Sequence, residues 1–271
     1  MKAVVCTKYG PPEVLQLQEV EKPAPKYNEV RIKIHATAVT ASDCIVRGFK
    51  LPRWHPMGFL MGLVIGFRGP RNPILGMVLA GEIEAVGRDT TQFKLGDQVF
   101  AFVGTRFGCY AEYICLPDKD RSGLPGTLPS LMTLKPSTMT YEEAAATVFG
   151  VMLASHFLRK GHIQRGQKVL IYGASGAIGS TAVQIAKHHY GAEVTGVCST
   201  SNLELVTSLG ADHVLDYTTH DSLADGARFD FVLDAVGKRK SSRLKMACKN
   251  ALTPHGTYVS VDDGGQVRKL L

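Results

Sequence analysis

Glycines recur every three residues in one short stretch of the chain, Gly173-Ala-Ser-Gly-Ala-Ile-Gly179. Glycines at this spacing allow a tight turn, let the backbone approach a pyrophosphate and let the next helix pack closely on the preceding strand. The amide groups at the start of that helix then point towards the phosphates. The predicted dinucleotide contacts are Gly173, Ser175, Gly176, Ala177, Ile178 and Gly179. A tight turn in an α/β unit that binds nothing is the alternative.

The elements around the glycines follow a β-α-β pattern. Residues 168–172 are continuously apolar after Lys168, which is typical of a strand covered on both faces. Residues 178–190 carry apolar side chains at helical spacing, and residues 193–198 predict a second strand. All of this falls within about 30 residues, the size of a dinucleotide-binding unit. A helix near 203–209 and strands at 213–215, 229–233 and 257–261 continue the pattern.

The end of the second predicted strand bears on the choice of dinucleotide. An NAD site would place Asp or Glu there to accept from the ribose 2′-hydroxyl. The chain instead has Ser199, Ser201 and Asn202, and Glu204 comes one helical turn later. Hydroxyls, an amide and a new helix N-terminus suit a 2′-phosphate better. The sequence therefore favours NADPH, although the stretch has no Arg or Lys.

Composition limits the class of protein. The net charge is +7, but most of the 31 Lys and Arg residues are scattered. The dense stretch at 238–245 reads as a solvated helix face or as a positive surface that attracts an anionic cofactor. The sequence has no nucleic-acid-binding motif, so no nucleic-acid partner is expected. Its most apolar run, residues 57–67, is too short to span a bilayer, so no membrane association is expected. It reads as a core helix or the lining of an apolar substrate pocket.

The six cysteines are dispersed and form no Cys-x-x-Cys pair, as suits a reducing compartment. The N-terminus reads directly as a strand without a secretory segment, so a cytoplasmic location is expected.

Strand and turn signals dominate the first third of the chain, with strands expected at 29–34 and 81–87. Residues 117–136, rich in Pro, Gly, Ser and Asp, read as a connecting loop. A helix is expected from Tyr141, with Thr140 as its N-cap and Glu142 and Glu143 in its first turn. The fold class is therefore α/β, with a β-rich domain at 1–135 and a Rossmann doubly wound parallel sheet at 136–271.

A short-chain dehydrogenase is excluded. That class has its glycine loop near the N-terminus and a Tyr-x-x-x-Lys pair, whereas the loop here begins at Gly173 and none of the nine tyrosines has Lys four residues later.

With a β-rich part before a late glycine loop, the chain resembles the medium-chain dehydrogenase/reductase superfamily. The resemblance covers nearly the whole chain. It rests on the glycine loop and on residues 36–43, 47–48, 74–81, 84–87, 94–99, 108–113, 143–146, 209–212 and 216–217. It implies that the β-rich domain is GroES-like and catalytic.

The resemblance also implies a branch without zinc. Zinc alcohol dehydrogenases have Cys where Thr40 stands and His-Glu where Met77 and Val78 stand, and these three side chains cannot supply the ligands of a catalytic Zn²⁺. The four-cysteine structural zinc loop is absent as well. The chain is thus similar to the zinc-free quinone oxidoreductases, or zeta-crystallin-like reductases, which use NADPH. A zinc alcohol dehydrogenase remains the less favoured reading.

In that branch a hydride passes from the nicotinamide to a small carbonyl, enone or quinone substrate, and hydrogen-bond donors stabilise the oxyanion. The resemblance implies that Tyr217 contacts the adenosine end of the cofactor, and Asn202 stands where some members have Lys. By hypothesis Thr40 contacts the carbonyl oxygen or the nicotinamide ribose, while Asp43 orients Arg47 or a water. Structural roles for Thr40 and Asp43 are the alternative.

Family members continue beyond the fifth Rossmann strand, supplying a last strand, often used in dimerisation, and a helix that returns to the catalytic domain. The chain is therefore expected to be truncated at its C-terminus. An uncovered edge of the parallel sheet would favour a homodimer or cause instability. A truncated, non-catalytic NADPH-binding or regulatory protein is the alternative function.

Overall fold

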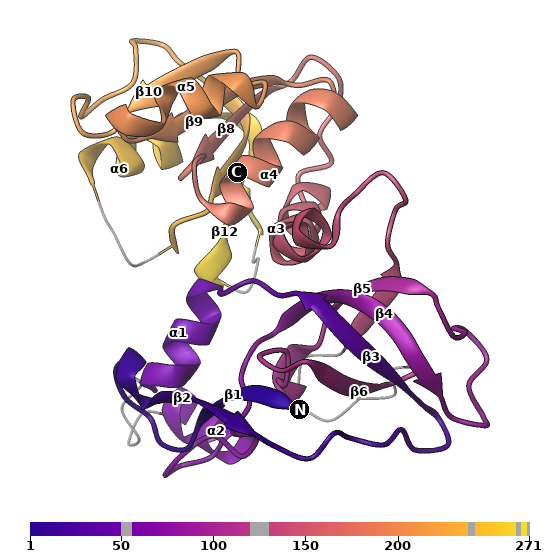
Figure 1. Ribbon diagram of the computed structural model, residues 1–271. Helices are drawn as coiled ribbons and strands as arrows, with labels where there is room; N and C mark the ends of the chain where they lie inside the picture. The colour runs from indigo at the N-terminus through magenta and orange to yellow at the C-terminus, as the bar shows by residue number, and fades with distance from the viewer. Residues whose placement is uncertain (50–55, 120–129, 238–241, 264–266, 270–271) are drawn as a thin grey trace. The chain divides into compact units, whose positions relative to one another are not determined.

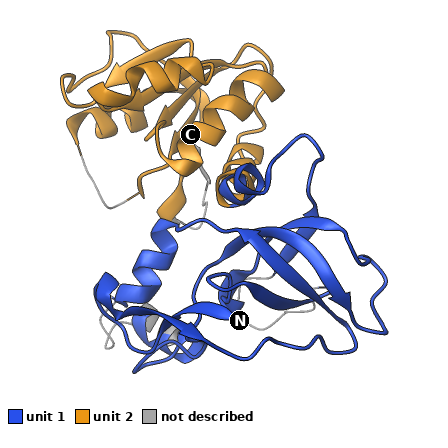
Figure 2. Ribbon diagram, viewed as in Figure 1, with its two compact units in different colours: residues 1–148 blue, residues 149–271 orange. Residues whose placement is uncertain are grey.

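The computed structural model describes residues 1–49, 56–119, 130–237, 242–263 and 267–269 (Figure 1). The chain divides into two compact units, Met1–Val148 and Phe149–Leu271 (Figure 2).

Unit 1 is built around a five-stranded antiparallel sheet in the order β6-β3-β4-β5-β7, together with a β1-β2 hairpin. Its strands are β1 (Lys2–Cys6), β2 (Leu15–Glu19), β3 (Glu29–Ala36), β4 (Val78–Val86), β5 (Gln98–Phe102), β6 (Tyr113–Pro117) and β7 (Leu131–Leu134). Its helices are α1 (Ala41–Gly48), α2 (Pro56–Ile65) and the start of α3 (Tyr141–Arg159), with 3₁₀ turns η1 (Pro12–Val14) and η2 (Gly104–Arg106). Side chains of β3 point alternately to the two faces of the sheet, and one face packs on the core. Val30 and Ile32 are fully buried, whereas Lys33 points to solvent.

The structure tests two expectations about unit 1, one for residues 117–136 and one for residues 57–67. The prediction that 117–136 is only a connecting loop is wrong at its end, because β7 pairs antiparallel with β5. The four residues of β7 form a short and largely exposed edge strand, which the turn-forming residues before it obscure. The apolar run at 57–67 is helical as far as Ile65: in α2, Ile65 is buried while Phe59 and Leu63 are exposed.

Unit 2 contains a six-stranded sheet in the order β10-β9-β8-β11-β12-β13. Its strands are β8 (Lys168–Tyr172), β9 (Glu193–Cys198), β10 (His213–Asp216), β11 (Phe229–Asp234), β12 (Leu252–Ser260) and β13 (Val267–Lys269). Its helices are the rest of α3, α4 (Ala177–Gln184), α5 (Leu203–Ser208) and α6 (Arg243–Asn250), with η3 (Ile185–His189), η4 (Thr200–Asn202) and η6 (Val261–Asp263). The first five strands are parallel, so the predicted Rossmann sheet is confirmed.

Both faces of this sheet are buried, because neighbouring residues of β8 enter different hydrophobic clusters. Val169 and Ile171 pack with residues of α3, α4 and α5, whereas Leu170 and Tyr172 pack with residues of α6. A strand between two layers must be apolar throughout, which is why β8 shows no polar alternation.

The sheet edge beyond β12 differs from the expectation of an uncovered parallel edge. β13 pairs antiparallel with β12, with Val267 opposite Val259, so the chain's own residues occupy that position. The antiparallel pairing needs only a short turn, whereas another parallel strand would require a crossover.

Two helices of the fold follow their sequence signals. Thr140 accepts a hydrogen bond from the Glu143 amide at 3.1 Å, and Glu143 accepts one from the Thr140 amide at 2.8 Å, so the predicted cap of α3 is a reciprocal capping box. The helix predicted at 178–190 begins one residue earlier. Its last part, η3, is a π turn, in which the Tyr190 amide reaches Ile185 O at 3.2 Å.

Candidate nucleotide-binding site

The glycine loop joins the end of β8 to the start of α4, as its sequence predicts. Gly173 has a φ of +85°, a left-handed conformation that favours glycine. Gly173 and Ala174 both donate their amides to Val197 O on the neighbouring strand β9, at 3.0 and 2.9 Å. A Cβ on Gly179 would lie 2.1 Å from Gly173 O, so only glycine allows the helix to approach the loop this closely. Turn shape and helix packing thus each require one of these glycines.

The first turn of α4 carries amides without a side-chain partner. Its N-cap, Gly176, is extended, with φ −77° and ψ 168°, and makes no side-chain capping bond. The Ser180 amide closes the first helical turn onto Gly176 O at 2.8 Å. The amides of Ala177, Ile178 and Gly179 precede this bond and have no i−4 carbonyl within the helix. Such groups, at the positive end of the helix dipole, form an anion-binding site.

A cavity of about 530 Å³ opens beside this loop. It brings together six of the predicted cofactor contacts: Gly173, Ser175, Gly176, Ser199, Asn202 and Tyr217. The lining also includes Tyr172, Cys198, Ala235, Val236 and Ser242, which no sequence motif indicates. Ala177, Ile178 and Gly179 form the adjacent first turn of α4, and Ser201 contacts Ser199 but is not part of the lining. All of these residues belong to unit 2.

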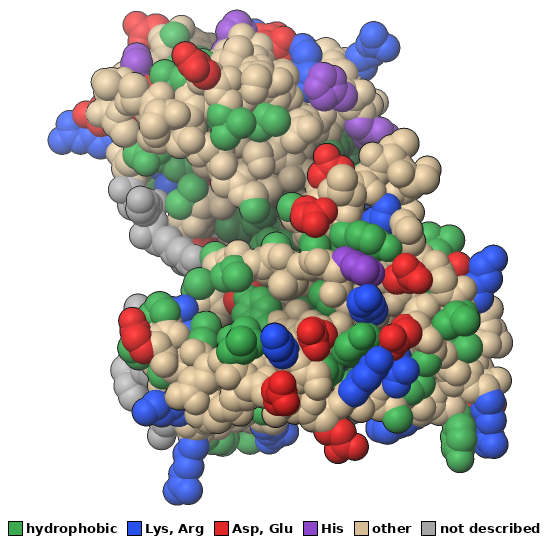
Figure 3. Space-filling model, viewed as in Figure 1, with side chains coloured by type: hydrophobic (Ala, Val, Ile, Leu, Met, Phe, Trp, Pro, Cys, Tyr) green, Lys and Arg blue, Asp and Glu red, His purple; other side chains and the backbone are tan. Residues whose placement is uncertain are grey.

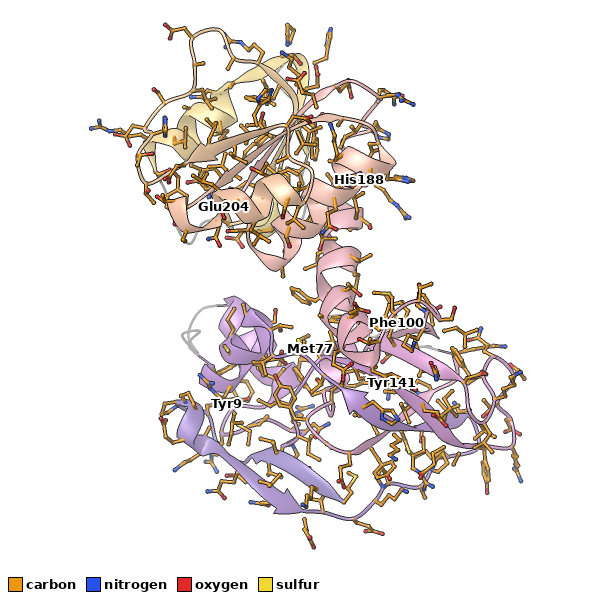
Figure 4. All side chains as sticks on the ribbon, turned by 45° about the horizontal axis from the view of Figure 1, so that its top comes forward. Tyr9, Met77, Phe100, Tyr141, His188 and Glu204 are labelled. Atoms are coloured by element: carbon orange, nitrogen blue, oxygen red, sulfur yellow. The ribbon has the colours of Figure 1, made fainter. Side chains whose placement is uncertain are left out.

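Polar groups at the end of β9 form a connected set. Asn202 donates from Nδ2 to Ser199 Oγ at 2.8 Å, and Ser201 Oγ lies 3.3 Å from Ser199 Oγ. Ser199 accepts the Asn202 bond, so its own hydroxyl proton is directed to Ser201 or to a ligand. Glu204 is exposed in the first turn of α5 (Figure 4), and the described lining contains no carboxylate. This end of the cavity therefore offers hydroxyl and amide donors.

Two buried carboxylates hold the walls of the cavity. Asp216, at the end of β10, accepts bonds from Thr200 Oγ1 and from the amide and hydroxyl of Thr218. The Thr200 and then the Thr218 bonds lower the pKa of Asp216, which keeps it ionised. Asp234, at the end of β11, accepts the amides of Val236 and Gly237 at 3.1 and 3.0 Å.

The Asp234 wall continues into α6. Lys245 Nζ lies 2.8 Å from Asp234 Oδ2, which also accepts from the Tyr258 hydroxyl at 2.8 Å. The N-cap of α6, Ser242, has its Oγ 2.9 Å from the Tyr172 hydroxyl. The sequence offered only a weak signal for this set, since its members come from four separate elements. A carboxylate that ends a buried parallel strand is that signal, because ligands bind at this edge of such sheets.

In unit 1 the two predicted catalytic residues contact each other. Thr40 is the N-cap of α1, and its hydroxyl donates to Asp43 Oδ2 at 2.6 Å. Asp43 Oδ2 also accepts the Thr40 amide at 2.8 Å, and Thr40 Oγ1 accepts the Asp43 amide at 3.3 Å. Arg47, which Asp43 was expected to orient, donates from Nε to Gly10 O at 3.3 Å. The Thr-x-x-Asp spacing before a helix is a capping-box signal, so the sequence itself allows this structural role.

Asp43 nevertheless has an unsatisfied atom. Asp43 is 3% exposed, and its Oδ1 and the Tyr110 hydroxyl are the two buried side-chain polar atoms without a hydrogen-bond partner among the described residues. Burial, and then the charge of Asp43, raise the pKa of the Tyr110 phenol, which therefore stays protonated. The Tyr110 ring lies over Gly76, where a Cβ would be 2.6 Å from its Cδ1. Met77, the next residue, is buried (Figure 4).

Three further features concern metal ligands, membrane-spanning helices and basic residues. No group of three or more His, Cys, Asp or Glu side chains suited to a metal occurs among the described residues. Within the same part of the chain, no helix is both long and apolar enough to cross a membrane. On the face drawn in Figure 3, Lys and Arg of unit 1 are interspersed with Asp and Glu. Of the basic stretch at 238–245, residues 238–241 lie outside the described residues.

Comparison with known proteins agrees with this geometry. Residues 26–126 match the alcohol dehydrogenase GroES-like domain, and residues 177–265 match the family described as zinc-binding dehydrogenase. The chain is 31% identical to the 2-methylene-furan-3-one reductase of Solanum lycopersicum over all of this chain and 68% of the relative. Identity and coverage are the same for the chloroplastic NADPH-dependent alkenal/one oxidoreductase of Arabidopsis thaliana.

The fold also matches solved structures. The quinone oxidoreductase from Coxiella burnetii aligns with a TM-score of 0.77 and 27% identity, over 96% of this chain and 75% of that one. The GroES-like match in unit 1, the parallel sheet of unit 2 and these relatives agree with one another. The chain therefore belongs to the medium-chain dehydrogenase/reductase superfamily, in its quinone oxidoreductase-like branch of oxidoreductases that use a nicotinamide cofactor.

Proposed function

We propose that the chain is an NADPH-dependent, zinc-independent reductase that transfers a hydride to a small enone, quinone or other carbonyl substrate. The observation that carries the proposal is the uncapped first turn of α4, which opens beside a cavity lined by hydroxyl and amide groups. NADPH, when bound, supplies the hydride from its nicotinamide ring.

The diphosphate is assigned to the start of α4. The free amides of Ala177, Ile178 and Gly179 and the helix dipole favour an anion there, and Gly176 has no side chain that would compete for them. The hydroxyl of Ser175 also lines the cavity and is a further donor. The pyrophosphate is the anionic part of the dinucleotide that such a group of amides would bind.

The preference for NADPH over NADH rests on the end of β9. Ser199, Ser201 and Asn202 supply donors, whereas a ribose 2′-hydroxyl would be matched by a carboxylate acceptor. The described cavity lining contains no Lys or Arg, so the donors that would meet the phosphate are uncharged. We therefore expect a moderate preference, with NADH used at higher concentration. Tyr217, 38% exposed and in the same lining, is assigned to the adenosine.

Zinc independence follows from the residues at the positions of the family's catalytic zinc ligands. Thr40 uses its hydroxyl proton on Asp43, and neither Met77 nor Val78 supplies an imidazole or a carboxylate. An oxyanion must then be stabilised by hydrogen-bond donors instead of a Lewis acid.

The capping box also limits the kind of ligand group that the Thr40 hydroxyl can contact. Its proton points to Asp43, so towards a ligand the oxygen can accept but not donate. That polarity suits a ribose hydroxyl of the nicotinamide half better than a substrate carbonyl oxygen. Asp43 is assigned to positioning Thr40. A Thr40→Val enzyme that keeps its full kcat/KM would remove Thr40 from the mechanism.

The test is titration of the intact chain with NADPH and with NADH by calorimetry, followed by NADPH consumption against quinones, enones and aldehydes. We expect NADPH to bind about tenfold more tightly than NADH, a difference of about 1.4 kcal/mol. Turnover of at least one enone or quinone is expected. If neither dinucleotide binds, the proposal fails; tight binding without turnover would favour a non-catalytic NADPH-binding protein.

Elemental analysis of the same sample addresses zinc. Activity without stoichiometric zinc is expected, and activity lost on chelation and restored by zinc would overturn that part of the proposal. The predicted cytoplasmic location and homodimer remain predictions; the Arabidopsis thaliana relative is a chloroplastic protein.

A further inference from the structure

One buried carboxylate connects the two turns that carry the adenosine side of the cavity. The first turn, Ser199–Asn202, follows β9 and supplies Ser199 and Asn202 to the lining. The second follows β10 and supplies Tyr217. Asp216 stands between them: it is paired in register with Cys198 and is 5% exposed.

The contacts of Asp216 leave little freedom to either turn. Its Oδ2 accepts from Thr200 Oγ1 at 2.5 Å, and its Oδ1 accepts from the amide and hydroxyl of Thr218 at 2.8 and 2.7 Å. The Thr200 and Thr218 hydroxyls also lie 3.0 Å apart. A carboxylate only accepts, so both hydroxyl protons point to Asp216.

Tyr217 is fixed from both sides by this arrangement. The Thr218 bonds hold the residue after it, and the Tyr217 amide donates to Cys198 O at 3.1 Å. In the other turn the Asn202 amide donates to Ser199 O at 2.9 Å, while Thr200, between them, is held by Asp216. Asp216, Thr200 and Thr218 are not themselves part of the cavity lining. They are next in the chain to residues that line it: Thr200 follows Ser199, and Asp216 and Thr218 flank Tyr217.

We propose that Asp216 is the positioning residue of the adenosine 2′-phosphate subsite, holding Ser199, Asn202 and Tyr217 in place through Thr200 and Thr218. This inference rests on the proposed binding of NADPH in the same cavity. Asp216 sets the affinity for the adenosine half of the cofactor and leaves the hydride-transfer step unchanged. Its loss should raise the dissociation constant without lowering turnover at saturation.

The chain contains a matched control in unit 1. Asp118 is 6% exposed and accepts from the Thr91 amide and hydroxyl at 2.8 and 3.2 Å and from the Gln92 amide at 3.0 Å. It therefore makes the same kinds of contact as Asp216, with a threonine hydroxyl and backbone amides, and lines no part of the dinucleotide cavity. Asp118→Asn measures the cost of losing such a carboxylate where no ligand is proposed.

The experiment compares wild type, Asp216→Asn and Asp118→Asn by calorimetry with NADPH and with adenosine 2′,5′-bisphosphate, which fills only the adenosine half. For Asp216→Asn we expect both dissociation constants to rise about tenfold, as for the loss of charge-assisted hydrogen bonds. We also expect kcat at saturating NADPH to stay within about twofold while KM rises, since a remote uniform-binding contact is removed. Asp118→Asn should leave both dissociation constants unchanged.

A second pair of variants covers the case in which Asp216→Asn does not fold. Thr200→Val removes one donor and keeps the carboxylate, whereas Thr200→Ser keeps the hydroxyl. The valine variant should weaken binding of the bisphosphate, and the serine variant should restore it.

Three results would overturn the inference: folded Asp216 and Thr200 variants that bind the bisphosphate like wild type, an equal effect of Asp118→Asn, or weaker NADPH binding with unchanged bisphosphate binding. In each case the wild type still binds NADPH, so the proposed function survives. A wild-type chain that binds neither compound overturns both.

Discussion

The helices of this protein begin in two different ways. The first turns of α1 and α3 are closed by reciprocal capping boxes, Thr40 with Asp43 and Thr140 with Glu143, and α6 is capped by Ser242, which accepts the Lys245 amide. Helices α4 and α5 begin with no side-chain capping bond, α4 at Gly176 and α5 at Asn202, where it continues from the 3₁₀ turn η4. Three helices thus satisfy amides with their own side chains, whereas the first turn of α4 leaves its amides open beside a cavity.

The difference separates stability from binding. A side-chain cap contributes about 1 kcal/mol to stability, and glycine at the same position gives up only a few tenths. Leaving α4 uncapped is therefore cheap for the fold, while its amides and dipole remain available to an anion. In the capped helices the same groups are already occupied. Substitutions at the N-cap of α4 should therefore change NADPH affinity more than stability. Substitutions at a capped helix start should change stability and leave NADPH affinity unchanged.

The largest effect is expected from Gly179→Ala. The new Cβ would meet Gly173 O at 2.1 Å and the Ala174 Cα at 2.8 Å, so backbone must move. We expect a loss of about 1–3 kcal/mol of unfolding free energy, as for overpacking, together with loss of measurable NADPH binding. Gly176→Ala is the control, because its Cβ has 3.5 Å to Gly173 O and its φ of −77° suits any residue. Thermal melts and calorimetry on both variants test this prediction. Equal melting temperatures and equal NADPH affinities of the two variants would contradict the role given to Gly179.

The next effect, Gly176→Asp, converts α4 into a capped helix. The carboxylate should accept from the first-turn amides that are assigned to the diphosphate, and it would also repel the ligand. We expect stability to hold or rise by a few tenths of a kcal/mol and the NADPH dissociation constant to rise on the order of 100-fold. Gly176→Asn caps without charge and should fall between this variant and wild type. An aspartate variant that binds NADPH normally would remove the diphosphate from this helix start.

Elements of both units could be predicted where a local pattern determines them. The bounds of β8 and β9 agree with the sequence prediction because a strand buried on both faces is apolar throughout, and the glycine loop agrees because its spacing has a geometric cause. Strands β7 and β13 were missed, because each is short and lies at a sheet edge, where pairing rather than composition defines it. The π turn after α4 likewise has no sequence signature of its own.

The candidate site was predictable in its loops but not in its supports. Ser199, Asn202 and Tyr217, predicted to contact the cofactor, line one cavity, since each follows the carboxyl end of a parallel strand. Asp234 and Lys245 were missed, because their pairing joins two different elements, β11 and α6, and no local sequence pattern indicates it. Thr40 and Asp43 were predicted to be catalytic, with Asp43 orienting Arg47 or a water, and the structure gives them a capping geometry that their spacing already allowed.

A capped helix should respond in the opposite way to α4. Thr140→Ala removes the side chain that accepts the Glu143 amide at the start of α3. We expect a loss of about 1 kcal/mol of unfolding free energy, the usual cost of removing a threonine N-cap, with no change in NADPH affinity. Thr140→Ser keeps the hydroxyl and should restore most of the stability. Denaturant unfolding and calorimetry give the two readouts, and a dissociation constant that rises with Thr140→Ala would break the distinction between the two kinds of helix start.

The smallest effect concerns the capping carboxylate of α1, which acts beyond its own helix. Burial, and then Asp43, raise the pKa of Tyr110 above the ordinary value of 10, so the folded chain holds the phenol protonated where the unfolded chain ionises it. Stability from this neutral phenol is complete below pH 10 and is lost as pH rises towards the folded pKa. Tyr110→Phe removes both that loss and an unsatisfied buried hydroxyl. We therefore expect a change of less than about 1 kcal/mol at neutral pH and a shallower decline of the melting temperature above pH 10. Equal alkaline slopes in wild type and variant would show that the folded chain does not raise the pKa of the Tyr110 phenol.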